Sequence, residues 1–169
     1  YLTGRQLREA VPDSTIINHS SLVSVNHIED LFVGRMPNVC FLFYEWAEED
    51  GSLFGHWCLL VEQRDAIIAF DSYGGDPVEQ WDYVRGRFRT EPYLLELLSK
   101  SNKKVLWNDI PYQRQGNEVA TCGRHCIVRA QQEAMTPAEY ERWMKEKCKE
   151  MGVSADGVVT VLTHAEFGY

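Results

Sequence analysis

The sequence predicts an α+β fold in which a central mixed, largely antiparallel sheet is flanked by helices. Three runs rich in Val, Ile, Phe and Tyr follow one another in the first half of the chain, and each has the length of a strand. Segments whose apolar residues recur at helical spacing lie before and after these runs. Helices packed around one central sheet are the usual solution for such a pattern.

The N-terminal half is expected to contain two helices and then three strands. Residues 3–10 predict a short helix that Pro12 ends. Residues 24–33 predict a second helix, capped by Ser24, because Ile28, Leu31 and Phe32 fall on one face. Strands are predicted at residues 38–46, 56–61 and 66–70, with a turn at 48–51 and a polar connection at 62–65.

The C-terminal half is expected to be mostly helical. Helices are predicted at residues 77–84, 92–98, 122–134, 137–151 and 158–164, a short strand at 104–107, and a long polar loop at 108–120. The sequence contains no internal repeat and no linker-like segment. Because a length of 169 residues suits one domain, residues 1–169 are expected to form a single domain.

Composition narrows the classes of function. Apolar residues make up 44% and charged residues 25%, which is typical of a globular protein. The net charge of −8 argues against a general nucleic-acid binder. Basic residues gather only locally, where a solvated surface is the simpler interpretation: Arg85, Arg87, Arg89, Lys103 and Lys104. No apolar run approaches the roughly 18 residues that span a bilayer, so we expect no membrane association, and we expect a monomer.

The cysteines indicate a reducing environment. There are five, an odd number, and Cys40 and Cys58 lie in apolar strand-like runs. Free cysteine in such a setting behaves as a small buried hydrophobe. We therefore expect no disulfide framework and a reducing compartment.

His56 and Asp71 suit a base and the group that orients it. If the turn between their strands centres between Gln63 and Arg64, the two residues are direct cross-strand neighbours, with Cβ atoms about 4.5–5.5 Å apart. A carboxylate at that distance could accept the imidazole N–H and stabilise the imidazolium. The alternative is a strand histidine beside an unrelated turn aspartate.

Cys122 and Gln115 suit a nucleophile and an oxyanion-hole donor. Cys122 stands where the polar loop meets an apolar helix, and a cysteine in a first helical turn can have a depressed thiol pKa. Gln115, seven residues earlier, can donate hydrogen bonds without carrying charge. Together with the Cys122 backbone N–H it could stabilise a tetrahedral intermediate. Taken singly, a structural cysteine and an ordinary loop glutamine remain the alternatives.

A metal site is the main competing chemistry. Cys122, His125 and Cys126 lie within about one helical turn. A structural zinc site needs four ligands, usually in two paired clusters, and neither Cys148 nor His164 supplies a second pair. We therefore expect no metal and no cofactor, and we interpret Cys126 as a core residue.

These segments resemble the adenain-like cysteine proteases. The shared pattern is Gly-His-Trp at residues 55–57, Phe-Asp-Ser-Tyr-Gly at 70–74, a glutamine at 115, and Cys-Gly-x-x-Cys at 122–126. The group includes the adenovirus maturation protease and its relatives in large DNA viruses and virophages, and SUMO-deconjugating proteases belong to the same superfamily. The resemblance implies that His56, Asp71 and Cys122 are catalytic, that Gln115 lies in the oxyanion hole, and that the nucleophile begins a core helix. Gly55 and Trp57 would then contact substrate.

The resemblance implies a cysteine endopeptidase that processes viral structural precursors during virion maturation. A protease that removes ubiquitin-like modifiers is the alternative, and a catalytically silent binding domain is a third. The expected partner is a protein or peptide substrate, in host cytoplasm or nucleus or inside the virion. The chain departs from adenain in using Asp71 where adenain has a glutamate. It also lacks a cysteine near Lys103, so a disulfide-linked activating peptide is not expected, while another activating peptide stays open.

Overall fold

The computed structural model describes residues 2–32, 38–47, 49–51, 53–80, 91–116 and 119–169. The strands form one five-stranded sheet whose spatial order follows the chain. They are β1 (Thr15–Asn18), β2 (Val39–Ala47), β3 (Leu53–Glu62), β4 (Ala66–Phe70) and β5 (Lys104–Trp107). The α-helices are α1 (Gly4–Ala10), α3 (Tyr93–Lys100), α4 (Cys122–Gln131), α5 (Pro137–Met151) and α6 (Ala155–Phe167), and the 3₁₀ helices are η1 (His19–Ser24) and η2 (Ile28–Leu31).

The sheet is mixed. The three central strands β2, β3 and β4 pair antiparallel, whereas β1 joins β2 and β5 joins β4 in parallel. The α+β class and the mixed sheet are therefore confirmed. The antiparallel pairing is confined to the three central strands, because both edge strands run parallel to their neighbours.

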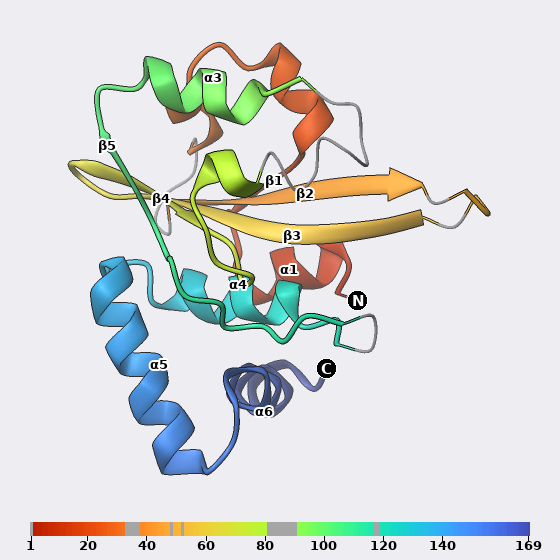
Figure 1. The fold of residues 1–169 in the computed structure, drawn as a ribbon, viewed down its shortest axis with the longest axis vertical. Helices are drawn as coiled ribbons and strands as arrows, with labels where there is room; N and C mark the ends of the chain where they lie inside the picture. The colour runs from red at the N-terminus through yellow and green to blue at the C-terminus, as the bar shows by residue number, and fades with distance from the viewer. Residues whose placement is uncertain (1, 33–37, 48, 52, 81–90, 117–118) are drawn as a thin grey trace.

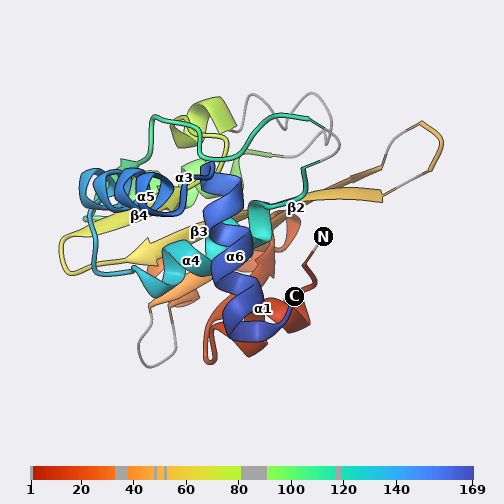
Figure 2. The same ribbon diagram turned by 90° about the horizontal axis from the view of Figure 1, so that it is seen from below.

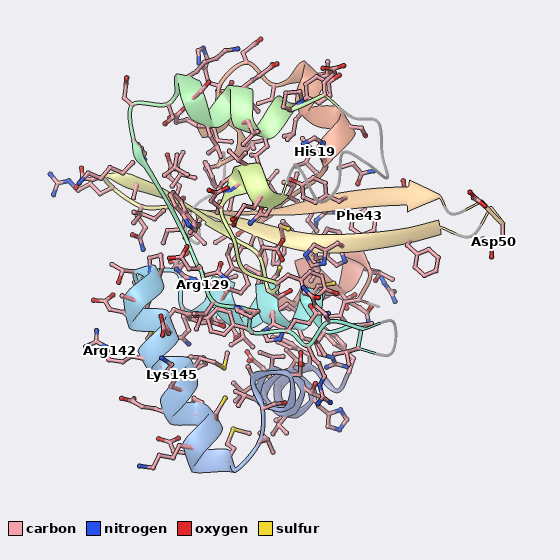
Figure 3. All side chains as sticks on the ribbon, viewed as in Figure 1. His19, Phe43, Asp50, Arg129, Arg142 and Lys145 are labelled. Atoms are coloured by element: carbon pink, nitrogen blue, oxygen red, sulfur yellow. The ribbon has the colours of Figure 1, made fainter. Side chains whose placement is uncertain are left out.

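Two hydrophobic layers cover the two faces of the sheet (Figure 1). Helices α1, α4, α5 and α6 lie on one side, and α3 with the two 3₁₀ helices lies on the other. Alternate residues of β3 supply the two layers, since Leu59 belongs to the first and Leu60 to the second. In Figure 3, Arg129 lies on the first side and His19 on the second.

Helix α4 occupies the middle of the first layer. It packs directly against β3 and against α6, and Figure 2 shows α6 crossing it on the outer side. Its residues Cys126 and Ile127 are fully buried. The first residue of this central helix is therefore held next to β3, the strand that carries His56.

Some predicted elements differ in the structure. The helix predicted at residues 24–33 is wrong for the described residues: Val25 is extended, and a short 3₁₀ helix begins after His27, whose backbone N–H donates to Asp30. Strand β1 and helix η1 were not predicted. Helix α4 ends at Gln131 rather than 134, because the Arg129 guanidinium donates to the carbonyls of Gln132 and Met135.

The other helices agree in position. α6 is longer than predicted because Ser154 caps its start and Gly168, at φ 77°, ends it. Residues 77–80 are helical, as predicted, while residues 81–84 of that predicted helix lie outside the described residues. Arg85, Arg87 and Arg89 lie outside them too. Among the described helices, none combines the length and apolar character needed to span a membrane.

Candidate active site

The β3–β4 hairpin brings His56 and Asp71 to one place. The Gln63 backbone N–H donates to the Ala66 carbonyl, so the turn centres one residue later than the sequence analysis assumed. The observed register pairs Leu59 with Phe70, and extending it sets Asp71 opposite Cys58 rather than His56. The prediction of direct cross-strand neighbours is therefore wrong. The two residues are diagonal neighbours, which are still within reach of a long side chain.

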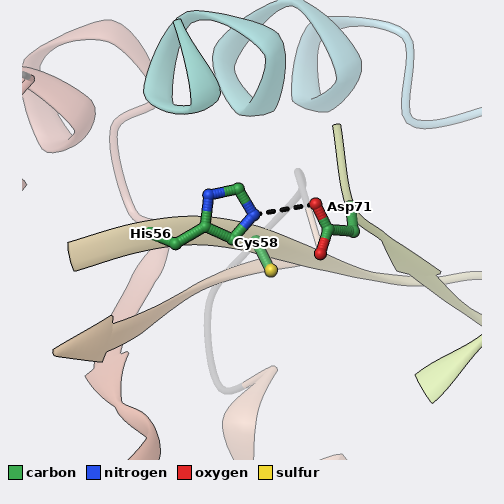
Figure 4. Close-up of side chains that lie close together, drawn as sticks. All are labelled: His56, Cys58 and Asp71. Atoms are coloured by element: carbon green, nitrogen blue, oxygen red, sulfur yellow. Dashed lines mark hydrogen bonds and ion pairs between the residues drawn. The ribbon is translucent and has the colours of Figure 1, made fainter. Parts of the chain in front are cut away.

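The two side chains nevertheless form a short, buried hydrogen bond. His56 Nε2 lies 2.7 Å from Asp71 Oδ1, and both residues are about 5% exposed (Figure 4). The same carboxylate oxygen accepts the Tyr73 backbone N–H at 2.8 Å. The Tyr73 ring stacks on the His56 imidazole, with centroids 4.8 Å apart. One carboxylate and one aromatic ring thus determine how the imidazole is oriented.

Asn108 holds the main chain of Asp71 in place. Its side-chain oxygen accepts the Asp71 backbone N–H at 3.2 Å, and its amide donates to the Asp71 carbonyl at 2.7 Å. These two bonds continue the β4–β5 pairing through a buried side chain, since Asn108 directly follows β5. The carboxylate therefore starts from a backbone position that is fixed on both sides.

Cys122 comes to the site from helix α4, which packs on the sheet, and not from the β3–β4 hairpin. It is the first residue of α4, where the partial positive charge of the helix end favours an anion. Because Nε2 of His56 faces Asp71, Nδ1 is the ring nitrogen left for the thiol, and in Figure 4 that nitrogen points toward α4. Among the groups that lower the pKa of the Cys122 thiol, the His56 imidazole acts most strongly, so the two side chains lie close to each other.

The electrostatics of this pair favour a thiolate and an imidazolium. Burial alone raises the pKa of Cys122, but the hydrogen bond and the charge of His56 outweigh it and lower the pKa below the ordinary value of 9.0. Burial alone lowers the pKa of His56, yet the Asp71 carboxylate raises it well above 6.5. Both directions describe one event, the transfer of the thiol proton to the imidazole.

The other four cysteines behave in the opposite way. Burial raises the pKa of Cys40 and of Cys58 to about 12, and it also raises the pKa of Cys126 and Cys148. Cys126 is core-facing as predicted, and its thiol donates to the Trp57 carbonyl at 3.4 Å. All five cysteines are free. Cys122 is thus the only cysteine whose surroundings favour the nucleophilic form.

The remaining predicted site residues are Gln115, Trp57 and Gly55. Gln115 is exposed in the loop between β5 and α4. Trp57 is buried, and its indole N–H donates to the Leu2 carbonyl at 3.0 Å. At Gly55 the Phe43 ring fills the space that a side chain would need, since an added Cβ would lie 1.9 Å from it. The absence of a side chain at Gly55 therefore serves packing of Phe43 over the strand.

A metal ion has one possible set of donors in the described part of the chain. A ring nitrogen of His56, the sulfur of Cys58 and a carboxylate oxygen of Asp71 all lie within 4.8 Å of one another (Figure 4). Nitrogen, sulfur and oxygen donors suit Zn²⁺. His56 and Asp71 are already bonded to each other, however, so a metal would have to replace that bond. The helical set weighed in the sequence does not converge, because His125 bonds Asp156 and Cys126 bonds Trp57.

Sequence reasoning missed three residues that support the site: Tyr73, Asn108 and Asp156. Tyr73 lies two residues after Asp71, and extending the observed hairpin register sets it opposite His56. The correct register would therefore have revealed it. Asn108 follows a strand directly, which is a weak signal for a buried side chain that pairs with backbone. Asp156 lies far along the chain in α6, and only the tertiary structure brings it to His125 and Thr121.

No protein-family model matches the chain. The chain is 30% identical over 154 residues to the uncharacterized protein V9 of Sputnik virophage. The aligned region covers 88% of this chain and 85% of V9. The chain belongs to the family of V9. It is therefore related to a viral protein, and the aligned region includes most of the sheet, the helices and the candidate site, since so little of either chain lies outside it.

Proposed function

We propose that this protein is a cysteine endopeptidase with Cys122 as nucleophile, His56 as base and Asp71 as the group that orients the base. One observation supports this most strongly. A buried cysteine with a lowered thiol pKa begins a helix beside a histidine whose other nitrogen is 2.7 Å from a carboxylate. A nucleophile, its base and an orienting group in hydrogen-bond sequence form the arrangement that activates a thiol for acyl transfer.

The chemistry follows from these positions. The Cys122 thiolate attacks the carbonyl carbon of the scissile peptide, and the carbonyl oxygen takes up the displaced electron pair. The Cys122 backbone N–H and the Gln115 amide stabilise that oxyanion. The His56 imidazolium gives its proton to the leaving amine, which leaves a thioester. His56 then takes a proton from water, which attacks the thioester and releases the acid and the thiolate.

We further propose that the fold is adenain-like and that the substrates are viral structural precursors. The motif order at residues 55–57, 70–74, 115 and 122–126 supports this, and so does the relationship to a virophage protein. The same chemistry would also remove ubiquitin-like modifiers, which are protein substrates of the same reaction class. The protein would act in the host cytoplasm or nucleus, or within the virion.

The test offers both substrate classes to the protein. Purified protein is incubated with a peptide library and with intact SUMO, NEDD8 and ubiquitin conjugates, and products are mapped by mass spectrometry. Cleavage is expected in peptides, and Cys122→Ala should abolish it while the melting temperature stays close to wild type. Cys148→Ala, which changes a half-buried cysteine in α5, is the matched control and should cleave normally. Cleavage that survives in Cys122→Ala rejects the proposed nucleophile, and cleavage confined to conjugates favours the deconjugase.

A further inference from the structure

One carboxylate in α6 binds three separate points around the candidate site. Asp156 Oδ1 accepts the Thr121 hydroxyl at 2.5 Å and the His125 Nε2 hydrogen at 3.0 Å. Asp156 Oδ2 accepts the Arg114 backbone N–H at 2.9 Å. The carboxylate therefore joins the loop between β5 and α4 to the first turn of α4.

The three points flank the two residues that would form the oxyanion hole. Arg114 directly precedes Gln115, and Thr121 directly precedes Cys122. His125 lies one turn further along α4 and is fully buried. Because the loop between Arg114 and Thr121 has no regular structure in its described residues, the distance between Gln115 and Cys122 depends on what holds its two ends. Asp156 holds both ends with the same side chain.

The Thr121 hydroxyl does not form the hydrogen bond that is usual for a threonine at the start of a helix. A threonine at the N-cap usually accepts a hydrogen bond from a backbone N–H of the first helical turn. Thr121 makes no such bond and donates to Asp156 instead. The first-turn N–H groups of α4 are thereby left without that side-chain acceptor, which suits a helix end that has to stabilise a thiolate and then an oxyanion.

The contact with His125 is that of a neutral imidazole. Burial lowers the pKa of His125, and the Asp156 carboxylate opposes this shift only in part. Nε2 then carries the hydrogen that Asp156 accepts, and Nδ1 is the bare nitrogen, which is buried without a hydrogen-bond partner among the described residues. Leaving a buried nitrogen as an unpaired acceptor costs less free energy than leaving it as an unpaired N–H donor. The interaction is thus a fixed hydrogen bond that ties α6 to α4.

We propose that Asp156 is a positioning residue that sets the geometry between Gln115 and Cys122. The proposal rests on the proposed function, because it assigns Asp156 a part in forming the oxyanion hole. Asp156 touches neither the thiol nor the His56–Asp71 pair, so it acts on the stabilisation of the intermediate and leaves the activation of the nucleophile unchanged. A small misplacement of an oxyanion donor is costly because the donor acts only in the transition state.

The test separates these two effects with Asp156→Asn and Asp156→Ala. Asparagine keeps the shape but cannot accept from Thr121, His125 and Arg114 together. We expect kcat for a cleaved peptide to fall by about 10- to 100-fold, more in alanine than in asparagine, while KM stays within about twofold. Binding of a peptide aldehyde, whose thiohemiacetal needs the oxyanion hole, should weaken in parallel. Alkylation of Cys122 by iodoacetamide needs no oxyanion hole and should stay within about twofold of wild type.

Ser154→Ala is the matched control. It removes the N-cap bond of the same helix, from the Gly157 N–H to the Ser154 hydroxyl, and leaves the Asp156 contacts in place. It should leave kcat unchanged. Two outcomes overturn the proposal: an unchanged kcat in Asp156→Ala, or an alkylation rate that falls together with kcat, which would indicate general loss of the site.

A separate measurement does not depend on peptidase activity. Hydrogen exchange of the peptide that covers residues 113–121 should speed up in Asp156→Asn relative to both wild type and Ser154→Ala, because the Arg114 amide loses its acceptor. Unchanged exchange rejects the role of Asp156 even if wild type cleaves peptides. Faster exchange in a protein that cleaves nothing supports the role of Asp156 in holding the loop and counts against the proposed function instead.

Discussion

Asp71 reaches His56 diagonally across the β3–β4 hairpin, and its oxygen Oδ1 accepts two hydrogen bonds at once. One comes from the imidazole at 2.7 Å and the other from the Tyr73 backbone N–H at 2.8 Å. The backbone donor fixes which carboxylate oxygen meets the ring. The imidazole must then present a hydrogen on Nε2, and its Nδ1 is the nitrogen that exchanges a proton with Cys122 in the proposed mechanism.

Asp71→Asn should lower kcat/KM by about 10²- to 10⁴-fold, because an amide that turns its NH₂ group to His56 favours the wrong tautomer. Peptide kinetics measure the loss. Asp76→Asn is the control, since it alters a nearby carboxylate that bonds the Val78 and Glu79 backbone N–H groups instead. Equal losses in the two variants would show that the effect is not specific to the His56 contact.

Gln115→Ala should lower kcat by about 10²-fold with little change in KM, since an oxyanion-hole donor acts mainly in the transition state. Steady-state kinetics on a cleaved peptide distinguish the two constants. Arg114→Ala removes the neighbouring exposed side chain but keeps the backbone N–H that Asp156 accepts, and it should be neutral. A change confined to KM would mean that Gln115 only binds substrate.

Cys122 should react with iodoacetamide much faster than the other four cysteines, because only its thiol pKa is lowered. The thiolate persists below the ordinary pKa of 9.0, so the rate should hold as the pH falls below 9 and decline only through the lowered pKa. Mass spectrometry of labelled peptides maps the reaction.

His56→Ala is the control for this reactivity and should remove the advantage of Cys122. Equal labelling of all five cysteines in the wild-type protein would show that no couple exists in the free protein. Repeating the labelling with a substrate-like peptide then shows whether the couple assembles on binding.

The stability of the protein should fall in mild acid because of His19. Its imidazole stacks on Tyr44, with centroids 4.7 Å apart, and also lies near Tyr93. Both its nitrogens are buried, and neither has a hydrogen-bond partner within the part of the chain that the structure describes. Burial lowers its pKa from 6.5 to about 4, so the unfolded chain binds a proton that the native chain refuses. Stability from this group is complete above pH 6.5 and is lost as the pH falls toward 4, by up to about 3 kcal/mol.

Urea unfolding of wild type and of His19→Phe between pH 7 and pH 4 isolates this term. Phenylalanine keeps the stacked ring and cannot titrate, whereas the carboxylates change equally in both proteins. The free energy of unfolding should drop more steeply with acid in the wild type. Parallel curves would show that His19 can be protonated in the native state at little cost.

The fold class and most elements could be predicted because their signals are local. The strands around Phe41 and Leu59 and the helix that begins at Cys122 each carry their pattern within a few residues. The hairpin register could not, because it depends on a tight turn in which the Gln63 N–H meets the Ala66 carbonyl. The observed pairing differs from the expected one by two residues, which keeps the same side chains on each face of the sheet. The hydrophobic pattern therefore fits both registers.

The candidate site divides in the same way. His56, Asp71 and Cys122 stand in recognisable motifs, and the structure brings them together through a diagonal contact that the motifs do not specify. Asn108 and Asp156 carry no motif, because their function depends on partners that are distant in the chain. The roles of such residues can be recognised only from the three-dimensional structure.

The proposed base lies on the sheet and the proposed nucleophile lies on a helix that packs against the sheet. The reactivity of the thiol therefore reports whether this packing has formed. His56 and Asp71 come from one hairpin, whereas Cys122 arrives only when α4 packs on β3. A nascent or partly assembled chain therefore carries an ordinary, protonated thiol. Under the proposed function, a chain that has not yet packed α4 on β3 would be unable to cleave its neighbours during synthesis, so the packing of residues 122–131 would set the time at which cleavage becomes possible.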